Sequence, residues 1–265
     1  MRGSTIRAEI GRLTRSGDSR LTCPVRVEGI ESLTPGFTRV TVQGDGLAAY
    51  RTIRPADAFK LMIPPDGFGS VRMPKVGPSG APVWPEDRPT PLTREFTVRT
   101  FDPGTRRLAF DVVLHGDSPA ITWLGNTRPG DTLVLLGMRR EFHAGDVDHH
   151  LLIGDSTSLP AIASIVESLD VPSTVYLQAE SPAERSLVKG DVQWIHAQPL
   201  TALEQTVRTF VRPPGRLQAW CAAEAGVVRS IRSYLVDDLG VHRDDLHTAP
   251  YWTADPAVVQ APEFS

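Results

Sequence analysis

The pattern of the chain changes near Val147, and no other sequence feature constrains the fold as strongly. Before this point, short segments rich in β-branched and aromatic residues alternate with Pro, Gly and Asp turns, which predicts strands. After it, apolar strands alternate with segments whose apolar residues recur at helical spacing. Since 265 residues exceed the usual size of one domain, two domains are expected. We therefore predict a small antiparallel β-barrel followed by an α/β domain with a parallel sheet.

Turn residues separate the strands expected in the first half. The stretch 64–91 is crowded with Pro and Gly and predicts a long surface loop. The segment 107–114 is expected to form a hairpin with the strand before it, through Asp102-Pro103-Gly104. The strands expected in this half are 25–30, 38–42, 59–63, the segment around 94–99, 107–114 and 132–136.

The stretch 91–102 carries the most chemistry in this half. It has the pattern Arg-x-aromatic-Thr-x-Arg at Arg94, Phe96, Thr97 and Arg99. On a strand, the first two side chains point one way and the last two the other. Such a segment could stack an aromatic ring on a flat cofactor and pair a guanidinium with its pyrophosphate. A barrel strand with charged residues on its wet face explains the same pattern equally well.

A turn and a short helix are expected at 115–123. Asp117 or Ser118 can cap this helix, and Pro119 suits its first turn. The free N–H groups at the start of the helix would suit a pyrophosphate. The alternative is a plain strand-to-helix corner in which Trp123 fills the core.

The second half opens with a strand, a polar turn and a helix. The apolar segment 149–153 enters the turn 155–160, and a helix is expected over 161–169. This order is typical of a nucleotide-binding α/β unit, although Gly-x-Gly-x-x-Gly is absent and another ligand remains open. Further strands are expected at 175–178, 192–196, 217–222 and 247–251, and further helices at 200–210 and 226–239.

Composition narrows the class of protein. A net charge of −3 and a pI near 6.2 indicate no general attraction to nucleic acid or anionic membranes. Cys23 and Cys221 lie far apart in sequence, so a cytoplasmic protein is expected. No apolar run reaches membrane-spanning length, and no signal peptide is evident. His149 and His150 would point to opposite faces of a strand, so no resident metal is expected. The expected regions are an arm at 1–20, the barrel at 21–146, the α/β domain at 147–253 and a tail at 254–265.

Five motifs follow one another along the chain. They are Arg94-Glu95-Phe96-Thr97-Val98-Arg99, then Val113-Leu114-His115-Gly116 with Pro119-Ala120 and Trp123, then Gly154-Asp155-x-Thr157-x-Leu159-Pro160-Ala161, then Trp220-x-Ala222-x-Glu224-Ala225, and Tyr251-Trp252. Together they resemble the siderophore-interacting proteins, the FAD-binding ferric-siderophore reductases within the wider ferredoxin-reductase-like group. The resemblance covers the chain from about Leu21 to Trp252.

The resemblance implies a flavin site on the barrel. Arg94 would meet the pyrophosphate of FAD, and Phe96 would pack on the flavin. Thr97 and Val98 would bond the polar edge of the ring. The residues implied to bind FAD are Arg94, Glu95, Phe96, Thr97, Val98, Arg99, His115, Gly116, Ala120, Ile121, Thr122, Trp123, Thr157 and Trp252.

The resemblance also implies a nucleotide-binding role for the α/β domain, in which NADPH or NADH passes a hydride to the flavin. Single electrons would then reduce Fe(III) held by a siderophore. The residues implied for the nicotinamide are Asp155, Thr157, Leu159, Pro160 and Glu224. Local positive charge would suit an anionic ferric complex, although scattered surface bases explain the same residues. The candidates for that contact are Arg51, Arg54, Lys60, Arg139 and Arg140.

Most departures from the family pattern fall on the nicotinamide side. Phe96 stands where the family has Tyr, and Ile121 where a Ser is usual. Ala223 replaces a Gly, and Thr253-Ala254-Asp255 replaces a basic residue and Gly. FAD binding is therefore the firmer expectation. Two functions remain open: a reductase of a ferric siderophore or similar acceptor, and an FAD-containing enzyme of specialised metabolism that catalyses a non-reductive reaction such as a cyclisation.

The aromatic pair Tyr251-Trp252 has two interpretations. In related reductases a C-terminal aromatic covers the flavin face where the nicotinamide lands, which would place one of these rings beside the flavin. Alternatively, Trp252 fastens the last strand to its own domain.

Overall fold

The computed structural model describes residues 21–51, 53–76, 82–83, 90–116, 118–196, 199 and 201–254. The chain divides into two compact units, with the boundary between Glu141 and Phe142. The expected arm at 1–20 and nearly all of the expected tail lie outside the described residues. In the described part of the chain, no helix has both the length and the apolar character that a membrane crossing requires.

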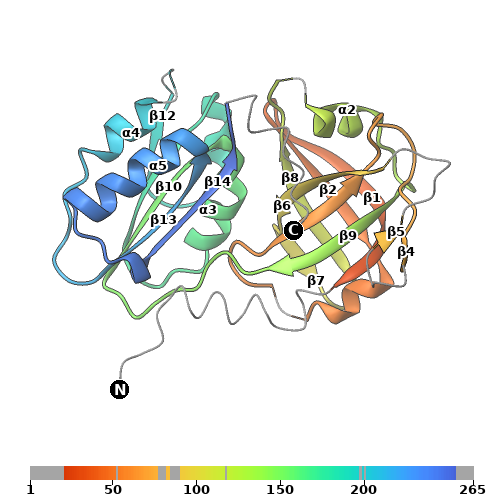
Figure 1. Ribbon diagram of the computed structural model, residues 1–265, viewed down its shortest axis with the longest axis horizontal. Coiled ribbons are helices and arrows are strands. Elements are labelled where there is room, and N and C mark those ends of the chain that lie inside the picture. Colours follow the sequence, from red (N-terminus) through yellow and green to blue (C-terminus); the bar gives the residue numbers. More distant parts are fainter. Residues whose placement is uncertain are drawn as a thin grey trace. The chain divides into compact units, whose positions relative to one another are not determined.

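The first unit is an antiparallel, barrel-like sheet (Figure 1). Its seven strands have the hydrogen-bonded order β6-β3-β9-β1-β2-β8-β7, so β6 and β7 are the two edges. The expected antiparallel architecture is confirmed, without pairing of these edges to close the barrel among the described residues. The strands are β1 (Thr22–Thr34), β2 (Phe37–Gln43), β3 (Ala58–Ile63), β6 (Leu92–Thr97), β7 (Thr100–Asp102), β8 (Arg107–Val113) and β9 (Thr132–Arg139), with the 3-10 helix η2 (Asp45–Ala49), the helix α2 (Pro119–Asn126) and a separate pair β4 (Lys75–Val76) and β5 (Pro82–Val83).

Alternation of side chains along the strands builds the core of this unit. In β1, Cys23, Val25 and Val27 are buried, whereas the residues between them are exposed. Three phenylalanines from β3, β6 and β8 meet inside the sheet. The ring of Phe96 lies 4.7 Å from that of Phe110 and 6.2 Å from that of Phe59, measured between centroids.

The hairpin expected at 91–114 is wrong in its pairing. β6 pairs with β3, and the partner of β8 across the Asp102–Gly104 turn is β7, a separate strand. The break lies at Val98 and Arg99. The N–H of Val98 donates to Asp57 O at 2.7 Å, whereas the N–H of Arg99 donates to Ala109 O at 2.8 Å. Within two residues the hydrogen-bond partner of the chain therefore changes from the β3 side of the sheet to β8.

The second unit is a five-stranded parallel sheet in the order β12-β11-β10-β13-β14. The helices cover both faces: α4 and α5 lie on one side and α3 on the other (Figure 1). The expected α/β architecture is confirmed. The elements are β10 (His149–Asp155), η3 (Ser156–Ser158), α3 (Leu159–Val166), β11 (Ser173–Gln178), η4 (Pro182–Leu187), β12 (Val192–Ile195), α4 (Thr201–Val207), β13 (Leu217–Glu224), α5 (Ala225–Ser233), the π-helical turn Tyr234–Asp238, η6 (Arg243–Asp245) and β14 (Leu246–Trp252).

A close approach at Gly154 brings α3 onto the sheet. A Cβ atom at this position would lie 1.9 Å from Ser158 Oγ and 2.7 Å from Ile162 Cδ1. Only glycine therefore fits at the end of β10 without moving α3. This contact keeps η3, the turn after β10, close to the end of the sheet.

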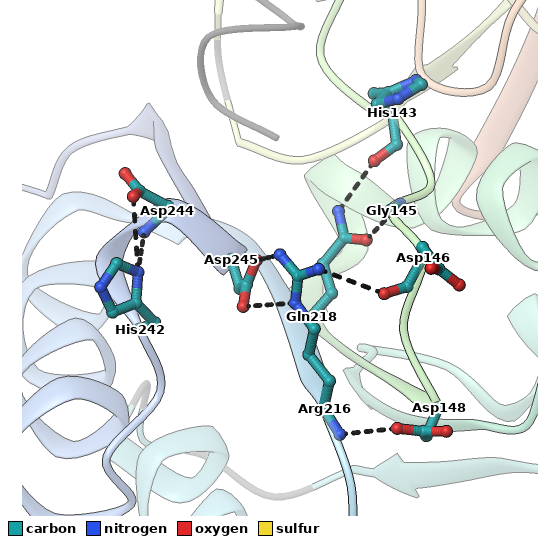
Figure 2. A network of polar contacts seen from close by, with 9 residues as sticks. All are labelled: His143, Gly145, Asp146, Asp148, Arg216, Gln218, His242, Asp244 and Asp245. Carbon is teal, nitrogen blue, oxygen red and sulfur yellow. Dashed lines mark hydrogen bonds and ion pairs between the residues drawn. The ribbon is translucent and has the colours of Figure 1, made fainter. Parts of the chain in front are cut away.

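The segment that follows the boundary is hydrogen-bonded to β13 (Figure 2). Gln218 donates to His143 O at 2.9 Å and accepts from the N–H of Gly145 at 3.0 Å. The N–H of Arg216 donates to Asp148 at 2.8 Å. These bonds attach the connecting segment to the second unit.

Candidate functional site

Arg94 is a half-buried cation on the inner face of β6. It pairs in register with Leu61, which is fully buried, and its Nη1 donates to Thr93 O at 2.8 Å. Burial lowers the pKa of this guanidinium. No carboxylate of the described residues forms an ion pair with it. A partly desolvated cation that lacks a counter-ion is costly, so this position favours an anionic ligand.

The neighbouring Glu95 faces the opposite side of the sheet. It accepts from Arg139 at 2.8 Å and lies 3.4 Å from Lys60 Nζ. Two of the five bases considered for an anionic substrate are therefore already paired with a carboxylate. Arg51 and Arg54 are exposed.

The fifth base, Arg140, is not a surface residue. Its side chain is 5% exposed and forms an ion pair with the fully buried Asp57. Arg140 is therefore held inside the unit by Asp57 and is not displayed at the surface as a free base. The sequence could not show this because two consecutive arginines at the end of a strand look alike.

The other residues of the motif 94–99 are partly used in packing and hydrogen bonds within the unit. Phe96 packs on the core and remains partly exposed, and Thr97 is buried. The N–H of Val98 already donates to Asp57 O, so this group is not available to a ring. Arg99 is half-buried.

The helix α2 starts as expected, with Ser118 as its cap. The hydroxyl of Ser118 accepts from the N–H of Ile121 at 3.4 Å. Gly116 has a φ of +56°, a backbone conformation that favours glycine, and nothing lies within 4 Å of its missing side chain. Trp123 is 1% exposed inside the core, which agrees with the core-filling alternative and leaves no ring face for a ligand. Asp117 lies outside the described residues.

Other residues at the start of α2 differ in exposure. Ala120 and Ile121 pack partly against the core, and Thr122 is exposed. His115 is half-buried just before the turn. The exposed backbone around Gly116 and the side chain of Thr122 are thus the parts of this motif open to a ligand.

Asp155 is the centre of a hydrogen-bond network at the carboxyl end of β10. It is 8% exposed and accepts from the N–H and the hydroxyl of Thr157 at 2.9 and 2.5 Å. It also accepts from the N–H of Glu224 at 3.1 Å and the indole N–H of Trp252 at 2.8 Å. Burial raises the pKa of Asp155, and these donors act in the opposite direction. The carboxylate thus occupies donors that a phosphate would otherwise use.

Glu224 plays the same part at the start of α5. Its Oε2 accepts from the N–H groups of Gly226 and Val227, the latter at 3.0 Å, and its Oε1 accepts from the N–H of Ala254 at 3.2 Å. Burial is the largest single influence and raises the pKa of Glu224, but these donors together with Arg229 bring it below its usual value. Leu159 and Pro160 are buried in α3 and offer packing rather than polar contacts.

Trp252 is bound to its own unit through Asp155, and β14 pairs with β13 in parallel. This is the fastening role that the sequence left open. Sequence reasoning missed two other polar contacts: the hydroxyl of Ser156 donates to the buried Glu184 at 2.9 Å, and Tyr50 bonds Asp57 at 2.6 Å. Neither pair has a spacing that predicts contact, because the partners lie on separate elements.

The donor set near β6 fits FAD better than a resident metal. Arg94 supplies a cation with no carboxylate partner among the described residues, the turn at Gly116 supplies exposed backbone, and Phe96 supplies a partly exposed aromatic ring. Among the residues that the structure describes, no three His, Cys, Asp or Glu side chains are grouped to hold a metal ion.

Known proteins match both units. The family model described as a siderophore-interacting FAD-binding domain matches residues 26–142, and the one described as siderophore-interacting protein matches 147–255. The ferric vibriobactin reductase ViuB of Vibrio cholerae is 26% identical over 235 residues, which cover 83% of this chain and 85% of ViuB.

Two further relatives extend this match. The mycobactin import ATP-binding/permease protein IrtA of Mycobacterium tuberculosis is 26% identical over 260 residues, which are 94% of this chain but 28% of IrtA, so the chain spans about a quarter of that relative's length. The crystal structure of a siderophore utilization protein from T. fusca superimposes with a TM-score of 0.71 at 28% identity, covering 88% of this chain and 93% of that one. The chain belongs to the siderophore-interacting protein family, whose two characteristic domains it contains in sequence.

Proposed function

We propose that this protein binds FAD and reduces the Fe(III) of a siderophore or a similar acceptor, with NADPH or NADH as the electron donor. The observation that carries the proposal is Arg94, a half-buried guanidinium without an acidic partner in the described structure, on the strand that matches the FAD-binding family model. A pyrophosphate would supply the missing negative charge in a charge-assisted contact. The names of ViuB and its family support the acceptor class.

In this proposal the chain's own residues bind and orient the cofactor. Arg94 holds the pyrophosphate, the backbone around Gly116 holds a second phosphate edge, and Phe96 covers part of the ring. When bound, FAD supplies the ability to accept a hydride and to deliver electrons one at a time. Ferric iron is the substrate, and its reduction weakens the hold of hard oxygen ligands, so the siderophore releases it.

The exposed bases Arg51 and Arg54 are the candidates that remain for an anionic ferric complex. Lys60 and Arg139 would have to exchange Glu95 for the substrate, and exposed pairs of this kind are worth only about 0–1 kcal/mol. We place this chemistry in the cytoplasm, where the two buried, unpaired cysteines Cys23 and Cys221 remain reduced.

Nicotinamide use is the weaker part of the proposal. Asp155 and Glu224 occupy backbone donors at the carboxyl end of the parallel sheet, which is where nucleotides bind in such folds. We therefore expect slow flavin reduction by NADPH or NADH. The non-reductive alternative, such as a cyclisation, finds no support in the names of these relatives.

The test is a comparison of FAD with FMN. Apoprotein is titrated with each flavin while flavin fluorescence is followed, and FAD should bind about 30-fold to 100-fold more tightly because FMN lacks the pyrophosphate. Loaded protein is then mixed without oxygen with NADH or NADPH, and with a ferric siderophore plus a chelator that reports ferrous iron. Slow bleaching of the flavin band followed by ferrous iron formation is expected.

Equal affinity for FAD and FMN would contradict the assignment of Arg94 to a pyrophosphate. Flavin reduction without ferrous iron formation across hydroxamate and catecholate siderophores would contradict the acceptor class. Prompt, saturable reduction at micromolar nicotinamide would show that the two carboxylates do not obstruct the nucleotide.

A further inference from the structure

Three buried polar side chains, Tyr50, Asp57 and Arg140, form a cluster inside the first unit. Tyr50 and Asp57 are 0% exposed and Arg140 is 5% exposed. One carboxylate oxygen of Asp57 accepts from the Tyr50 hydroxyl at 2.6 Å and from the N–H of Arg54 at 2.9 Å, and it also forms the ion pair with Arg140. The guanidinium of Arg140 lies 6.0 Å from the centroid of the Tyr50 ring.

Burying these polar and charged side chains has a large desolvation cost in free energy. Burial raises the pKa of Asp57, and the bonds from Arg140 and Tyr50 counter that effect. The second carboxylate oxygen, Oδ1, has no hydrogen-bond partner in the described structure. Apolar side chains of similar volume often stabilise such a site as well as a buried ion pair does, so stability alone does not account for the cluster.

The cluster lies directly beside the corner where the flavin strand ends. The backbone oxygen of Asp57 accepts from Val98 N–H at 2.7 Å, and this bond continues the β3–β6 pairing one residue beyond Ala58 and Thr97. The next residue, Arg99, already bonds Ala109. Asp57 therefore accepts the last hydrogen bond that this side of β6 makes to the β3 side, next to Thr97.

The loop before Asp57 needs outside support. Ala56 has a φ of +54°, a backbone conformation that is strained for a residue with a side chain. The Asp57 carboxylate accepts from the N–H of Arg54, three residues earlier, and from the hydroxyl of Tyr50, seven residues earlier. Arg140, directly after β9, fixes the carboxylate from the other neighbour of β3. Three elements thus converge on one side chain.

We propose that Asp57, held by Arg140 and Tyr50, is a positioning residue of the flavin site, which sets the corner at Val98 and thereby the placement of Thr97. This inference rests on the proposed binding of FAD. It assigns the buried pair a role in cofactor affinity rather than in the stability of the barrel.

Two sets of variants test this role. The double variant Asp57→Leu/Arg140→Met replaces the pair with apolar side chains, and Tyr50→Phe removes one donor without a change of charge. The matched control is Asp111→Leu/Arg39→Met, which removes the 2.7 Å pair between β8 and β2. For each protein, the FAD dissociation constant, the melting temperature of the apoprotein and the visible circular dichroism of bound flavin are measured.

The double variant should bind FAD at least about 10-fold more weakly, and Tyr50→Phe about threefold to tenfold, which corresponds to the net contribution of one ordinary hydrogen bond. The circular dichroism of the flavin should change in both variants, while the control keeps wild-type affinity and spectrum. If the double variant does not fold, Tyr50→Phe decides the matter.

Unchanged affinity and spectrum in Tyr50→Phe and in a folded double variant would overturn this inference alone. An equal loss of affinity in the Arg39–Asp111 control would also overturn it, because the effect would then be a general response to core changes. A wild-type protein that binds no FAD would overturn the proposed function itself, and that outcome is seen before any variant is compared.

Discussion

The two regions assigned to nucleotides differ in whether their polar groups are already satisfied. At β6, Arg94 is half-buried and has no carboxylate partner among the described residues. At the carboxyl end of the parallel sheet, Asp155 and Glu224 together accept from backbone N–H groups, a hydroxyl and an indole. The first region is left with charge that a ligand can neutralise. The second must give up internal bonds before it can offer the same donors, which teaches that similar polar groups can start from different states of satisfaction in two regions of one chain.

The largest expected effect is a loss of folding stability in the region around Asp155, where the polar groups already have partners. Asp155→Ala should lower the free energy of unfolding by about 3–5 kcal/mol, because it leaves several buried donors without an acceptor. Chemical denaturation of the apoprotein measures this. Asp148→Ala, which removes an exposed carboxylate from the same unit, is the control and should cost less than about 1 kcal/mol. Similar losses in both variants would show that the network around Asp155 is not special.

The next effect is a pH dependence of stability that comes from the opposite end of the parallel sheet, at the start of β10. Burial, with a smaller contribution from His149, lowers the pKa of His150 at the start of β10 to about 4 from a usual value of 6.5. The unfolded chain therefore takes up a proton first as the pH falls. This contribution to stability is complete above about pH 6.5 and is lost as the pH falls toward 4, by up to about 3 kcal/mol.

Denaturation curves at pH 7, 6, 5 and 4 measure this loss. His150→Leu should flatten the profile because it removes the titrating group. The substitution breaks no hydrogen bond of Nδ1, since this atom has no partner in the part of the chain that is described. A profile that keeps its slope in His150→Leu would assign the acid sensitivity to other groups.

A third effect tests the open side of the comparison. Arg94→Ala should weaken FAD binding by about 2–3 kcal/mol, through loss of a charge-assisted contact, and should leave the apoprotein as stable as before or slightly more stable. Calorimetric titration and thermal melting measure the two quantities. Arg107→Ala, which breaks only the exposed 2.8 Å pair with Glu28, should change neither by more than about 0.5 kcal/mol. A loss of apoprotein stability in Arg94→Ala without a loss of FAD affinity would show that Arg94 stabilises the fold and does not serve the ligand.

The smallest effect concerns the aromatic that fastens β14. Trp252→Phe keeps a ring but removes the 2.8 Å bond to Asp155, and it should lower stability by about 1–2 kcal/mol. The same change should speed flavin reduction by NADH or NADPH if the indole ring of Trp252 itself limits nucleotide access. Stopped-flow measurement of the flavin band tests this second part. An unchanged rate with the expected loss of stability would restrict Trp252 to packing.

Much of the fold could be predicted from sequence because local patterns repeat. The strands expected at 25–30 and 59–63 and the strand–turn–helix after His149 agree with β1, β3, β10 and α3 to within a few residues. The pairing of the hairpin was predicted wrongly, because β6 pairs with β3, a strand about 30 residues earlier in the chain, and local sequence signals do not show such a partner. The half-buried position of Arg94 and the interior location of Arg140 likewise could not be read from residue type.

The sequence by itself determined the order of the two domains, the alternation that buries one face of β1 and a polar cap at the start of α2. These depend on backbone preferences and on side-chain periods that extend over a few neighbouring residues. The tertiary structure alone decided which charges are satisfied by distant partners: Arg140 by Asp57, Lys60 and Arg139 by Glu95, and Asp155 by the N–H of Glu224 and the indole of Trp252. The physical reason is that the free energy of a charge depends on its burial and on partners that come from distant parts of the chain.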